Sequence, residues 1–247
     1  MMHVLGADRA GLFTRTEGLT TTEARAFGRA LCLRCTGVPV QHLTGSQSFR
    51  GLELAVGPGA FVPRPETEIL VDVALVALEH VERPVVVDVG TGTGAVALSI
   101  KDERSEAAVF ATELSPEGAC LARENAARTG VRVTVLEGDL LSPLPPELRG
   151  AVDMVVSNPP YVTPEEARSL PAEVLADPEL ALVGGTGVHR RLVDESPEWL
   201  RPRGALVVEV GADQGSEVRA MFEEGFEDVR VLPDLAGRDR VVAGRIP

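Results

Sequence analysis

A chain of 247 residues that is 44% hydrophobic and 25% charged has the composition of a folded globular protein, which excludes disordered, collagen-like and disulfide-scaffold classes. Its 24 Lys and Arg residues are outnumbered by 37 Asp and Glu residues, giving a net charge of −13. This balance disfavours stable nucleic-acid binding, which requires a broad cationic surface. No apolar run approaches the roughly 20 residues that cross a bilayer, and we expect a cytoplasmic protein with no membrane segment.

Residues 1–45 are predicted to form a small helical unit. Hydroxyl residues run up to Glu23 in the arrangement that caps a helix start, and small and apolar residues recur at helical spacing over residues 24–35. Cys32 and Cys35 lie on this helix without a second cysteine pair or a histidine cluster nearby, so we expect no metal site there.

Residues 46–62 are predicted to form a hairpin linker, because polar and apolar residues alternate on both sides of Gly51. The remaining residues, 63–247, then form the main domain. Its first helix is expected to open at residues 63–68, where a proline suits the first turn and the glutamates oppose the positive end of the helix dipole. The buried stripe of that helix is predicted to consist of Ile69, Leu70, Val73, Ala74 and Ala77.

Strand-like and helix-like segments alternate through the main domain. Short apolar strands are predicted at residues 85–89, 109–114, 131–136, 152–157, 205–210, 229–232 and 240–243. Helical patterns at residues 95–101 and 116–129 separate the first of these strands. The alternation predicts an α/β fold with a doubly wound, mostly parallel seven-stranded sheet covered on both faces. The last two strands are expected to form an antiparallel pair at one edge.

A glycine-rich turn follows the first predicted strand and precedes a helix. The turn consists of Gly90, Thr91, Gly92, Thr93 and Gly94. Glycines suit a site where the chain turns sharply and a ligand approaches the backbone. Glu113 ends the second strand, where a carboxylate can accept hydrogen bonds from both hydroxyls of a ribose. Together these features predict a cofactor that contains adenosine.

The details of the turn favour S-adenosylmethionine over a dinucleotide. Its spacing is Gly-x-Gly-x-Gly with Asp88 two residues ahead, whereas dinucleotide sites have Gly-x-Gly-x-x-Gly. An aspartate beside the glycines can bind the ammonium group of S-adenosylmethionine, and helix amides can bind its carboxylate. Asp139 and Leu140, after the third strand, are expected to border the adenine, and a place in the ordinary core is the other interpretation of Leu140.

The sequence Asn158-Pro159-Pro160-Tyr161 lies at the carboxyl end of the fourth predicted strand, beside the first. Prolines lack amide hydrogens, so the chain leaves the sheet there and its carbonyls remain free to accept. The Asn158 side-chain oxygen and the Pro159 carbonyl can take both hydrogens of a planar NH2 group while Tyr161 stacks on it. The nitrogen lone pair can then point at a methyl group without a strong general base. The structural alternative is a simple Pro-Pro turn after a strand.

Three motifs of this sequence resemble those of class I S-adenosylmethionine-dependent methyltransferases that act on exocyclic or amide nitrogens. They are Asp88 to Gly94, Glu113, and Asn158 to Tyr161. Residues 61–68 and 235–240 resemble more narrowly the protein-(glutamine-N5) methyltransferases of bacterial peptide chain release factors, and the likeness covers nearly the whole chain. The resemblance implies a Rossmann-like fold and methyl transfer from S-adenosylmethionine to the side-chain amide of the glutamine in the Gly-Gly-Gln motif of a release factor.

Carried over position by position, the resemblance assigns the cofactor side of the site. The turn at residues 90–94 would hold the methionine part of S-adenosylmethionine, Glu113 the ribose, and Leu140 the adenine. Phe61 and the segment to Glu68 would form a wall over the cofactor. A first-turn proline with two glutamates is also a good structural helix start, which is the alternative interpretation of that segment.

The same resemblance assigns the substrate side. The glutamine amide would be held by Asn158, Pro159, Pro160 and Tyr161. Catalysis falls to Asn158, Pro159 and Tyr161, and Asn158 also contacts the cofactor. No metal is implied, because the four histidines show no metal-ligand spacing and are expected at the surface or in turns. These are His3, His42, His80 and His189. Trp199 is expected in the core.

The sequence departs from that family at two places. The chain is expected to begin partway through the family's N-terminal helical domain, which helps hold the release factor. Residues 177–189 lack the acidic pair between glycines that the family more often has, and this loop is expected near the substrate side.

Three other functions remain open on the sequence alone. The Asn-Pro-Pro-Tyr motif also fits a methyltransferase for adenine N6 or guanine N2 of a nucleic acid, although the acidic balance and the scarcity of aromatic residues speak against a flipped base. A glutamine of a ribosomal protein is a further acceptor that the motif fits. A non-catalytic binding module that keeps the cofactor pocket is the third interpretation, which the intact motif disfavours.

Overall fold

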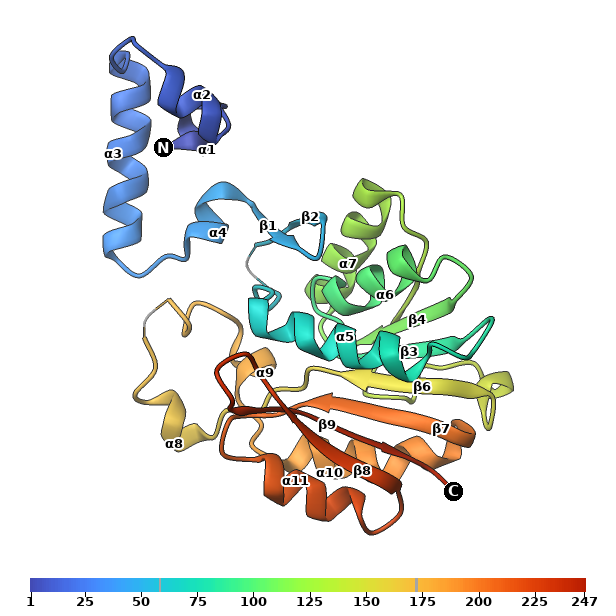
Figure 1. Ribbon diagram of the computed structural model, residues 1–247. Coiled ribbons are helices and arrows are strands. Elements are labelled where there is room, and N and C mark those ends of the chain that lie inside the picture. The colour runs from blue at the N-terminus through green and yellow to red at the C-terminus, as the bar shows by residue number, and fades with distance from the viewer. Residues whose placement is uncertain (58, 172) are drawn as a thin grey trace.

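The computed structural model describes residues 1–57, 59–171 and 173–247. Pro58, in the predicted linker, and Ala172, in the predicted main domain, lie outside the described residues. The described part consists of a helical N-terminal unit, a two-stranded hairpin and a seven-stranded sheet flanked by helices (Figure 1). The helical unit stands off from the sheet domain, and the hairpin lies between them (Figure 1). Within this part of the chain, no helix has the length and apolar character to span a membrane.

The N-terminal unit, all of which is described, contains four helices. They are α1 (Met2–Leu5), α2 (Arg9–Thr14), α3 (Thr21–Cys35) and α4 (Val40–Thr44). The predicted capping at the start of α3 is confirmed, because the Thr20 hydroxyl accepts a hydrogen bond from the Glu23 amide and the Glu23 carboxylate accepts one from the Thr20 amide. Cys32 and Cys35 are exposed on this helix.

The predicted hairpin is confirmed. Its strands are β1 (Ser46–Phe49) and β2 (Leu52–Ala55), which pair antiparallel. Arg50 and Gly51 form the two-residue loop with positive φ angles of 46° and 91°, a geometry that matches the right-handed twist of the strands. The Arg50 guanidinium bonds Glu103 and Asp72, each at 2.6 Å. The loop thereby ties the hairpin to two helices of the sheet domain.

The predicted seven-stranded, mostly parallel sheet is confirmed among the described residues. Its strands are β3 (Val85–Val89), β4 (Ala108–Glu113), β5 (Thr134–Glu137), β6 (Val152–Ser157), β7 (Leu200–Glu209), β8 (Glu227–Pro233) and β9 (Asp239–Arg245). Their order is β5-β4-β3-β6-β7-β9-β8, and β9 pairs antiparallel with both β7 and β8. The antiparallel pair therefore forms as expected, with β8 at the edge and the last strand of the chain inside the sheet.

Helices cover both faces of the sheet, as the doubly wound pattern predicts. The helices of this domain are α5 (Glu68–Ala77), α6 (Ala95–Glu103), α7 (Pro116–Thr129), α8 (Pro164–Ala167), α9 (Glu179–Leu182), α10 (Gly187–Glu195) and α11 (Gly215–Phe222), with 3-10 turns at Pro65–Thr67, Pro146–Leu148 and Ser196–Glu198. Of these, the short helices α8 and α9 lie in the segment between β6 and α10. Val86 of β3 joins one core with Leu70 of α5 and Leu98 of α6. Its neighbour Val87 joins a second core with Leu192 of α10 and Phe222 of α11, as alternation along a strand requires.

The buried stripe of α5 differs slightly from the prediction. Leu70 and Ala74 are fully buried as expected, and Val71 is fully buried as well. The other predicted positions are only partly buried: Ile69, Val73 and Ala77. This helix is apolar on most sides, so the sequence pattern alone does not fix which face meets the sheet. Trp199 is buried, as predicted.

One histidine contradicts the expectation of surface or turn positions. His3 and His80 are exposed and His42 is half-buried in α4, but His189 of α10 is fully buried. Its Nε2 atom lies 2.8 Å from the backbone carbonyl oxygen of Glu209, and burial lowers the pKa of the imidazole. A neutral imidazole that donates to a carbonyl can be buried at little cost. The lack of metal-ligand spacing therefore does not show that a histidine lies at the surface.

Candidate functional site

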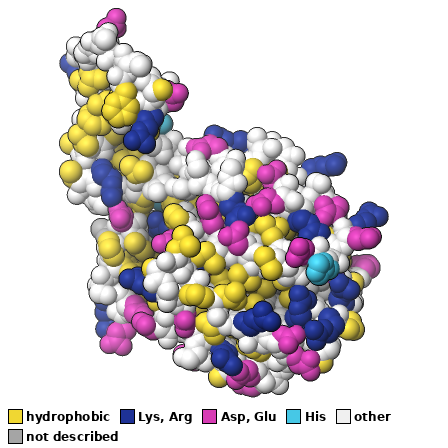
Figure 2. Space-filling view, in the orientation of Figure 1, with side chains coloured by type: hydrophobic (Ala, Val, Ile, Leu, Met, Phe, Trp, Pro, Cys, Tyr) yellow, Lys and Arg dark blue, Asp and Glu magenta, His cyan; other side chains and the backbone are white. Residues whose placement is uncertain are grey.

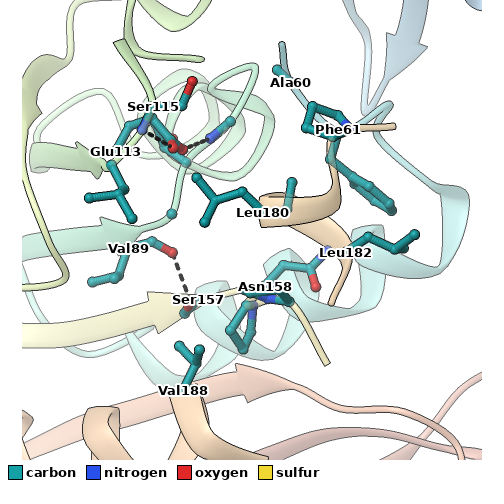
Figure 3. A pocket seen from close by; sticks show the side chains of 18 of the residues that line it. Ala60, Phe61, Val89, Glu113, Ser115, Ser157, Asn158, Leu180, Leu182 and Val188 are labelled. Atoms are coloured by element: carbon teal, nitrogen blue, oxygen red, sulfur yellow. Dashed lines mark hydrogen bonds between the residues drawn. The ribbon is translucent and has the colours of Figure 1, made fainter. Parts of the chain in front are cut away.

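A cavity of about 430 Å³ opens at the carboxyl ends of β3, β4 and β6. Open α/β sheets bind their ligands at this edge. The glycine turn after β3, Glu113 and Ser115 after β4, and the Asn-Pro-Pro-Tyr motif after β6 line one side. Phe61 and side chains of α9 line the other (Figure 3). The two sequence motifs, far apart in the chain, therefore face the same cavity.

The glycine turn presents bare backbone to the cavity at two of its three glycines. Gly90 and Gly92 have positive φ angles of 70° and 55°, and no neighbouring atom lies within 4 Å of where a Cβ would stand on either. Thr91 and Thr93 lie beside them and also line the cavity. The turn thus leaves room for a ligand directly against the main chain.

The third glycine of the turn, Gly94, is not among the described residues that line the cavity. It packs against neighbouring helices instead. Its φ angle is 84°, and a Cβ there would lie 3.1 Å from Cδ1 of Leu98 and 3.5 Å from Cα of Ala122. Leu98 belongs to α6 and Ala122 to α7. Gly94 therefore allows these two helices to approach the turn closely.

Asp88 lies beneath the glycine turn at the end of β3. Its Oδ2 atom accepts hydrogen bonds from the Thr91 hydroxyl at 2.6 Å and from the Ala97 amide at 3.1 Å. Burial, reinforced by the negative charge of Glu113, raises the pKa of Asp88 to about 7. This carboxyl fixes the turn against the start of α6, and its predicted contact with an ammonium group stays a prediction.

Glu113 connects the end of β4 to the glycine turn. Its carboxylate accepts hydrogen bonds from the Gly92 amide at 2.8 Å and from the Ser115 amide at 2.9 Å (Figure 3). Each carboxylate oxygen can accept more than one hydrogen bond, so the group keeps acceptor capacity toward the cavity. The structure thus gives Glu113 the task of holding the turn, and its predicted contact with a ribose stays a prediction.

The predicted adenine side contains an ion pair that sequence reasoning missed. Leu140 lines the cavity in a left-handed backbone conformation, with a φ of 45°. Asp139 binds the guanidinium of Arg191 from α10 with both oxygens, at 2.8 and 3.2 Å. Both side chains of the pair are about half exposed, so the pair is weak and can exchange for a ligand. The sequence analysis predicts no helix at residues 187–195, so it gives no reason to place Arg191 near Asp139.

The Asn-Pro-Pro-Tyr motif begins where β6 ends. The Ser157 hydroxyl donates to the Val89 carbonyl at 2.7 Å and holds the ends of β6 and β3 together (Figure 3). The Asn158 Nδ2 atom donates to the hydroxyl oxygen of Thr67 at 3.1 Å. Among the described residues, no donor bonds to the side-chain oxygen of Asn158, which leaves this oxygen available to a ligand.

The two prolines of the motif differ in what their carbonyls can do. Among the described residues, no donor bonds to the Pro159 carbonyl, which leaves it open to an outside donor. The Pro160 carbonyl is covered by the loop that follows: a Cβ on Gly184 would lie 2.3 Å from this oxygen. Pro159 therefore supplies the accessible carbonyl, and Pro160 contributes to the cavity wall.

Tyr161 is held from behind the cavity. Its hydroxyl donates to Oε1 of Glu209 at 3.3 Å, and its carbonyl accepts from the Gln214 side chain at 2.8 Å. Burial and the charge of Glu209 raise the pKa of Tyr161, so the phenol stays protonated. Sequence reasoning missed Glu209, although a carboxylate at the carboxyl end of an apolar strand is itself a signal in this type of sheet.

The segment at residues 61–68 contributes a wall of the cavity, and its predicted place over the cofactor stays a prediction. Phe61 lines the cavity, and the Arg64 guanidinium lies 5.0 Å from the centre of its ring. The buried carboxylate of Asp177 accepts hydrogen bonds from the Val62 amide at 3.2 Å and from Arg64 at 2.6 Å. Asp177 thus joins this wall to the loop that precedes α9.

The loop at residues 177–189 supplies an apolar roof that sequence reasoning placed only near the substrate. Leu180 and Leu182 of α9 line the cavity (Figure 3). Leu182 is buried, whereas Leu180 is 58% exposed. An exposed leucine at the mouth of a cavity suits contact with a ligand or partner.

Comparison with known families and proteins agrees with this geometry. Residues 66–237 match the methyltransferase small domain family, and residues 1–45 match the PrmC N-terminal domain family. The chain is 43% identical to the release factor glutamine methyltransferase of Deinococcus radiodurans, over 98% of this chain and 87% of that protein. It is 40% identical to the protein of the same description from Moorella thermoacetica, over 91% of this chain and 81% of that one.

A solved structure supports the fold independently of close sequence identity. The crystal structure of a methyltransferase from Pyrococcus furiosus aligns with a TM-score of 0.56 at 18% identity, covering 79% of this chain and 89% of that chain. At this level of identity the likeness concerns the architecture of the sheet and its helices.

Proposed function

Because this chain belongs to the release factor glutamine methyltransferase family, we propose that it methylates the side-chain amide of the glutamine in the Gly-Gly-Gln motif of a peptide chain release factor. The reaction belongs to translation termination, and we place the protein in the cytoplasm. The observation that carries the proposal is the common cavity, which brings a cofactor turn and a pair of free amide-binding oxygens together.

The cavity residues fit S-adenosylmethionine. A cradle that a Cβ would fill lies at Gly90 and Gly92, and the volume is in the range of sites for small organic ligands. In this proposal the turn from Gly90 to Thr93 holds the methionine part, Glu113 the ribose and Leu140 the adenine. When bound, S-adenosylmethionine supplies a methyl group on a positively charged sulfur.

The Asn-Pro-Pro-Tyr motif holds the acceptor amide in this proposal. The Asn158 oxygen and the Pro159 carbonyl each accept one hydrogen of the glutamine NH2 group, and the Tyr161 ring lies against its plane. An amide nitrogen is a poor nucleophile because its lone pair is delocalised, so alignment supplies much of the rate. After transfer the nitrogen is acidic, and a proton leaves it toward the same oxygens and then to water.

The net charge supports a protein acceptor over a nucleic acid. A value of −13 opposes binding of a phosphate backbone, and we expect no stable nucleic-acid complex. The family membership supports the release factor over a ribosomal protein.

The test is transfer of a labelled methyl group from S-adenosylmethionine to purified release factor. We expect the label on wild-type release factor and none on a variant whose acceptor glutamine is alanine. Duplex DNA and ribosomal RNA, offered as alternative acceptors, are expected to stay unlabelled. Label that persists without the acceptor glutamine, or that enters RNA, contradicts the proposed substrate.

The role of Asn158 is tested in the same assay with Asn158→Ala. Loss of one of two oriented hydrogen bonds and of alignment is expected to lower kcat by about 100-fold or more. Cofactor affinity, measured by calorimetry, should fall by only about threefold, because the turn and Glu113 remain. Unchanged turnover would show that Asn158 does not hold the acceptor.

A further inference from the structure

A buried carboxylate, Glu209, lies behind the Asn-Pro-Pro-Tyr motif at the end of β7. Its side chain is 2% exposed. Oε1 accepts the hydrogen bond from the Tyr161 hydroxyl, but Oε2 has no partner of standard hydrogen-bond geometry among the described residues. A buried carboxylate oxygen without a donor is costly, so packing alone does not account for this group.

Thr67 lies between Glu209 and Asn158. Its oxygen accepts the hydrogen bond from Nδ2 of Asn158 at 3.1 Å, and the residue is 3% exposed. Thr67 also lies close enough to the Glu209 carboxyl to lower its pKa, although no hydrogen bond of standard geometry joins the two side chains among the described residues. Because an ionised carboxylate can only accept, a hydrogen bond between the two groups has the Thr67 hydroxyl as its donor and leaves the lone pairs of that oxygen for Asn158.

Arg240 favours the ionised, acceptor-only form of Glu209. Its guanidinium lies 4.0 Å from Oε1 of Glu209, and the side chain is 11% exposed. It is anchored by Asp234 at 3.3 Å and by the Val210 carbonyl at 3.3 Å. Burial and the charge of Glu66 oppose this ionisation, and the pKa of Glu209 stands at about 7 as a result.

We propose that Glu209, acting through Thr67, fixes which way round the Asn158 side chain lies. A side-chain amide can turn over about its last bond and exchange its donor for its acceptor. With Thr67 directed by Glu209, the Asn158 nitrogen stays on the Thr67 side and the oxygen faces the cavity. This inference rests on the proposed function, in which that oxygen holds the acceptor amide.

The consequence concerns the choice of acceptor. An inverted Asn158 would bring its own NH2 group against the NH2 group of the substrate, where two donors face each other. Thr67 and Glu209 are therefore positioning residues for acceptors that donate two hydrogens. Tyr161 shares the arrangement, since its hydroxyl is held by the same carboxylate.

The kinetic test compares isosteric changes in the full-length protein. Thr67→Val removes the hydroxyl and keeps the shape, and Glu209→Gln replaces one acceptor by a donor. Both are expected to lower kcat by about tenfold, the effect of one misdirected hydrogen bond, with the Kd for S-adenosylmethionine within about threefold. Thr67→Ser keeps the hydroxyl and is expected to recover most of the lost kcat. Glu223→Gln, on the exposed end of α11, is the control and should behave as wild type.

A second measurement observes the amide itself. The sequence contains two asparagines, Asn158 and Asn125, so selective ¹⁵N labelling of asparagine gives two side-chain NH2 signals. Asn125 is fully buried, and its side chain forms hydrogen bonds with Ala55 and Thr93 and none with Thr67 among the described residues. Thr67→Val and Glu209→Gln are expected to shift the Asn158 pair and to leave the Asn125 pair in place.

Each outcome decides the question. Wild-type kcat together with an unmoved Asn158 signal in Thr67→Val overturns the proposal. Equal losses of kcat and cofactor affinity, with both asparagine signals displaced, also overturn it, because they indicate a general structural defect. If Thr67→Val does not fold, Glu209→Gln decides by the same two measurements. Failure of the proposed function is distinct, since the wild-type protein then places no label on the acceptor glutamine of release factor.

Discussion

The glycines of the cofactor turn show how neighbouring residues of one type serve different purposes. Gly90 and Gly92 face open space, where a side chain would occupy the ligand's place. Gly94 faces Leu98 and Ala122, where a side chain would push helices apart. All three have positive φ, so local strain alone cannot distinguish them.

Gly94→Ala is expected to destabilise the protein by roughly 2–3 kcal/mol, because left-handed strain of about 1 kcal/mol adds to crowding against α6 and α7. The matched control is Gly130→Ala at the end of α7, where φ is 74° and no atom lies within 4 Å of the added Cβ. That variant carries the strain alone and should cost about 1 kcal/mol. Urea unfolding of both variants measures the difference. Equal losses would show that Gly94 has no packing role.

At this scale, residues within one continuous motif were predictable and residues brought in from elsewhere were not. The turn at residues 90–94 and the Asn-Pro-Pro-Tyr motif carry their chemistry in local sequence. Glu209 and Arg191 reach the site from β7 and α10, through contacts that no spacing along the chain encodes. His189 was misplaced for the same reason, since its partner is a backbone carbonyl of β7.

Among the elements, the hairpin and α7 are joined by one buried side chain. Asn125 of α7 accepts from the Ala55 amide at 2.7 Å and donates to the Ala55 carbonyl at 3.0 Å. It also donates to the Thr93 carbonyl at 2.9 Å, in the cofactor turn. The backbone amide and carbonyl of Ala55 thereby obtain hydrogen-bond partners, as they would from a further strand, and the hairpin is connected to the turn.

Asn125→Ala is expected to reduce the free energy of unfolding by about 3 kcal/mol or more, because buried backbone groups of Ala55 and Thr93 lose their partners. The Kd for S-adenosylmethionine should rise as well, since one support of the turn is removed. The control is Arg123→Ala, which removes an exposed pair with Glu137 from the same helix and should cost less than 1 kcal/mol. Thermal unfolding with and without cofactor checks both. An unchanged Kd for S-adenosylmethionine would show that the bonds of Asn125 do not support the cofactor turn.

Elements with a strong local pattern were predicted to the residue. The strands Val85–Val89 and Val152–Ser157 and the helix Pro116–Thr129 have the predicted bounds, because each has a clear start and stop. In contrast, β7 begins at Leu200, five residues before the predicted start, in a stretch that contains Pro202 and Gly204. The helices α9 and α10 are missing from the prediction, although Val188 and Leu192 of α10, four residues apart, both pack into the second core.

The fold class of the whole molecule follows from the alternation of elements, whereas the strand order does not. The position of β9 between β7 and β8 depends on pairs such as Val208 with Val242, which are distant in sequence. The separate position of the N-terminal unit is likewise a property of the assembled chain (Figure 1). Its α3 reaches the loop of the sheet domain through an exposed ion pair between Arg34 and Glu173.

The N-terminal unit carries apolar side chains that remain about half or more exposed. Phe13 of α2 is 77% exposed, and Leu31 and Leu33 of α3 are 48% and 49% exposed. Figure 2 shows hydrophobic side chains gathered on this unit. In a protein that acts on another protein, such a surface is suited to substrate contact.

Phe13→Glu is therefore expected to raise the KM for release factor by about tenfold, since burying a phenylalanine at an interface contributes roughly 1.5–3 kcal/mol. Neither kcat at saturation nor the Kd for S-adenosylmethionine should change, because the cavity lies in the other unit. The control is Val76→Glu on α5, which places the same charge at a position that is 72% exposed on the sheet domain. Steady-state methylation at varied release factor concentration distinguishes the two variants. A KM equal to that of Val76→Glu would mean that the release factor is held by the sheet domain alone, with the N-terminal unit outside the contact.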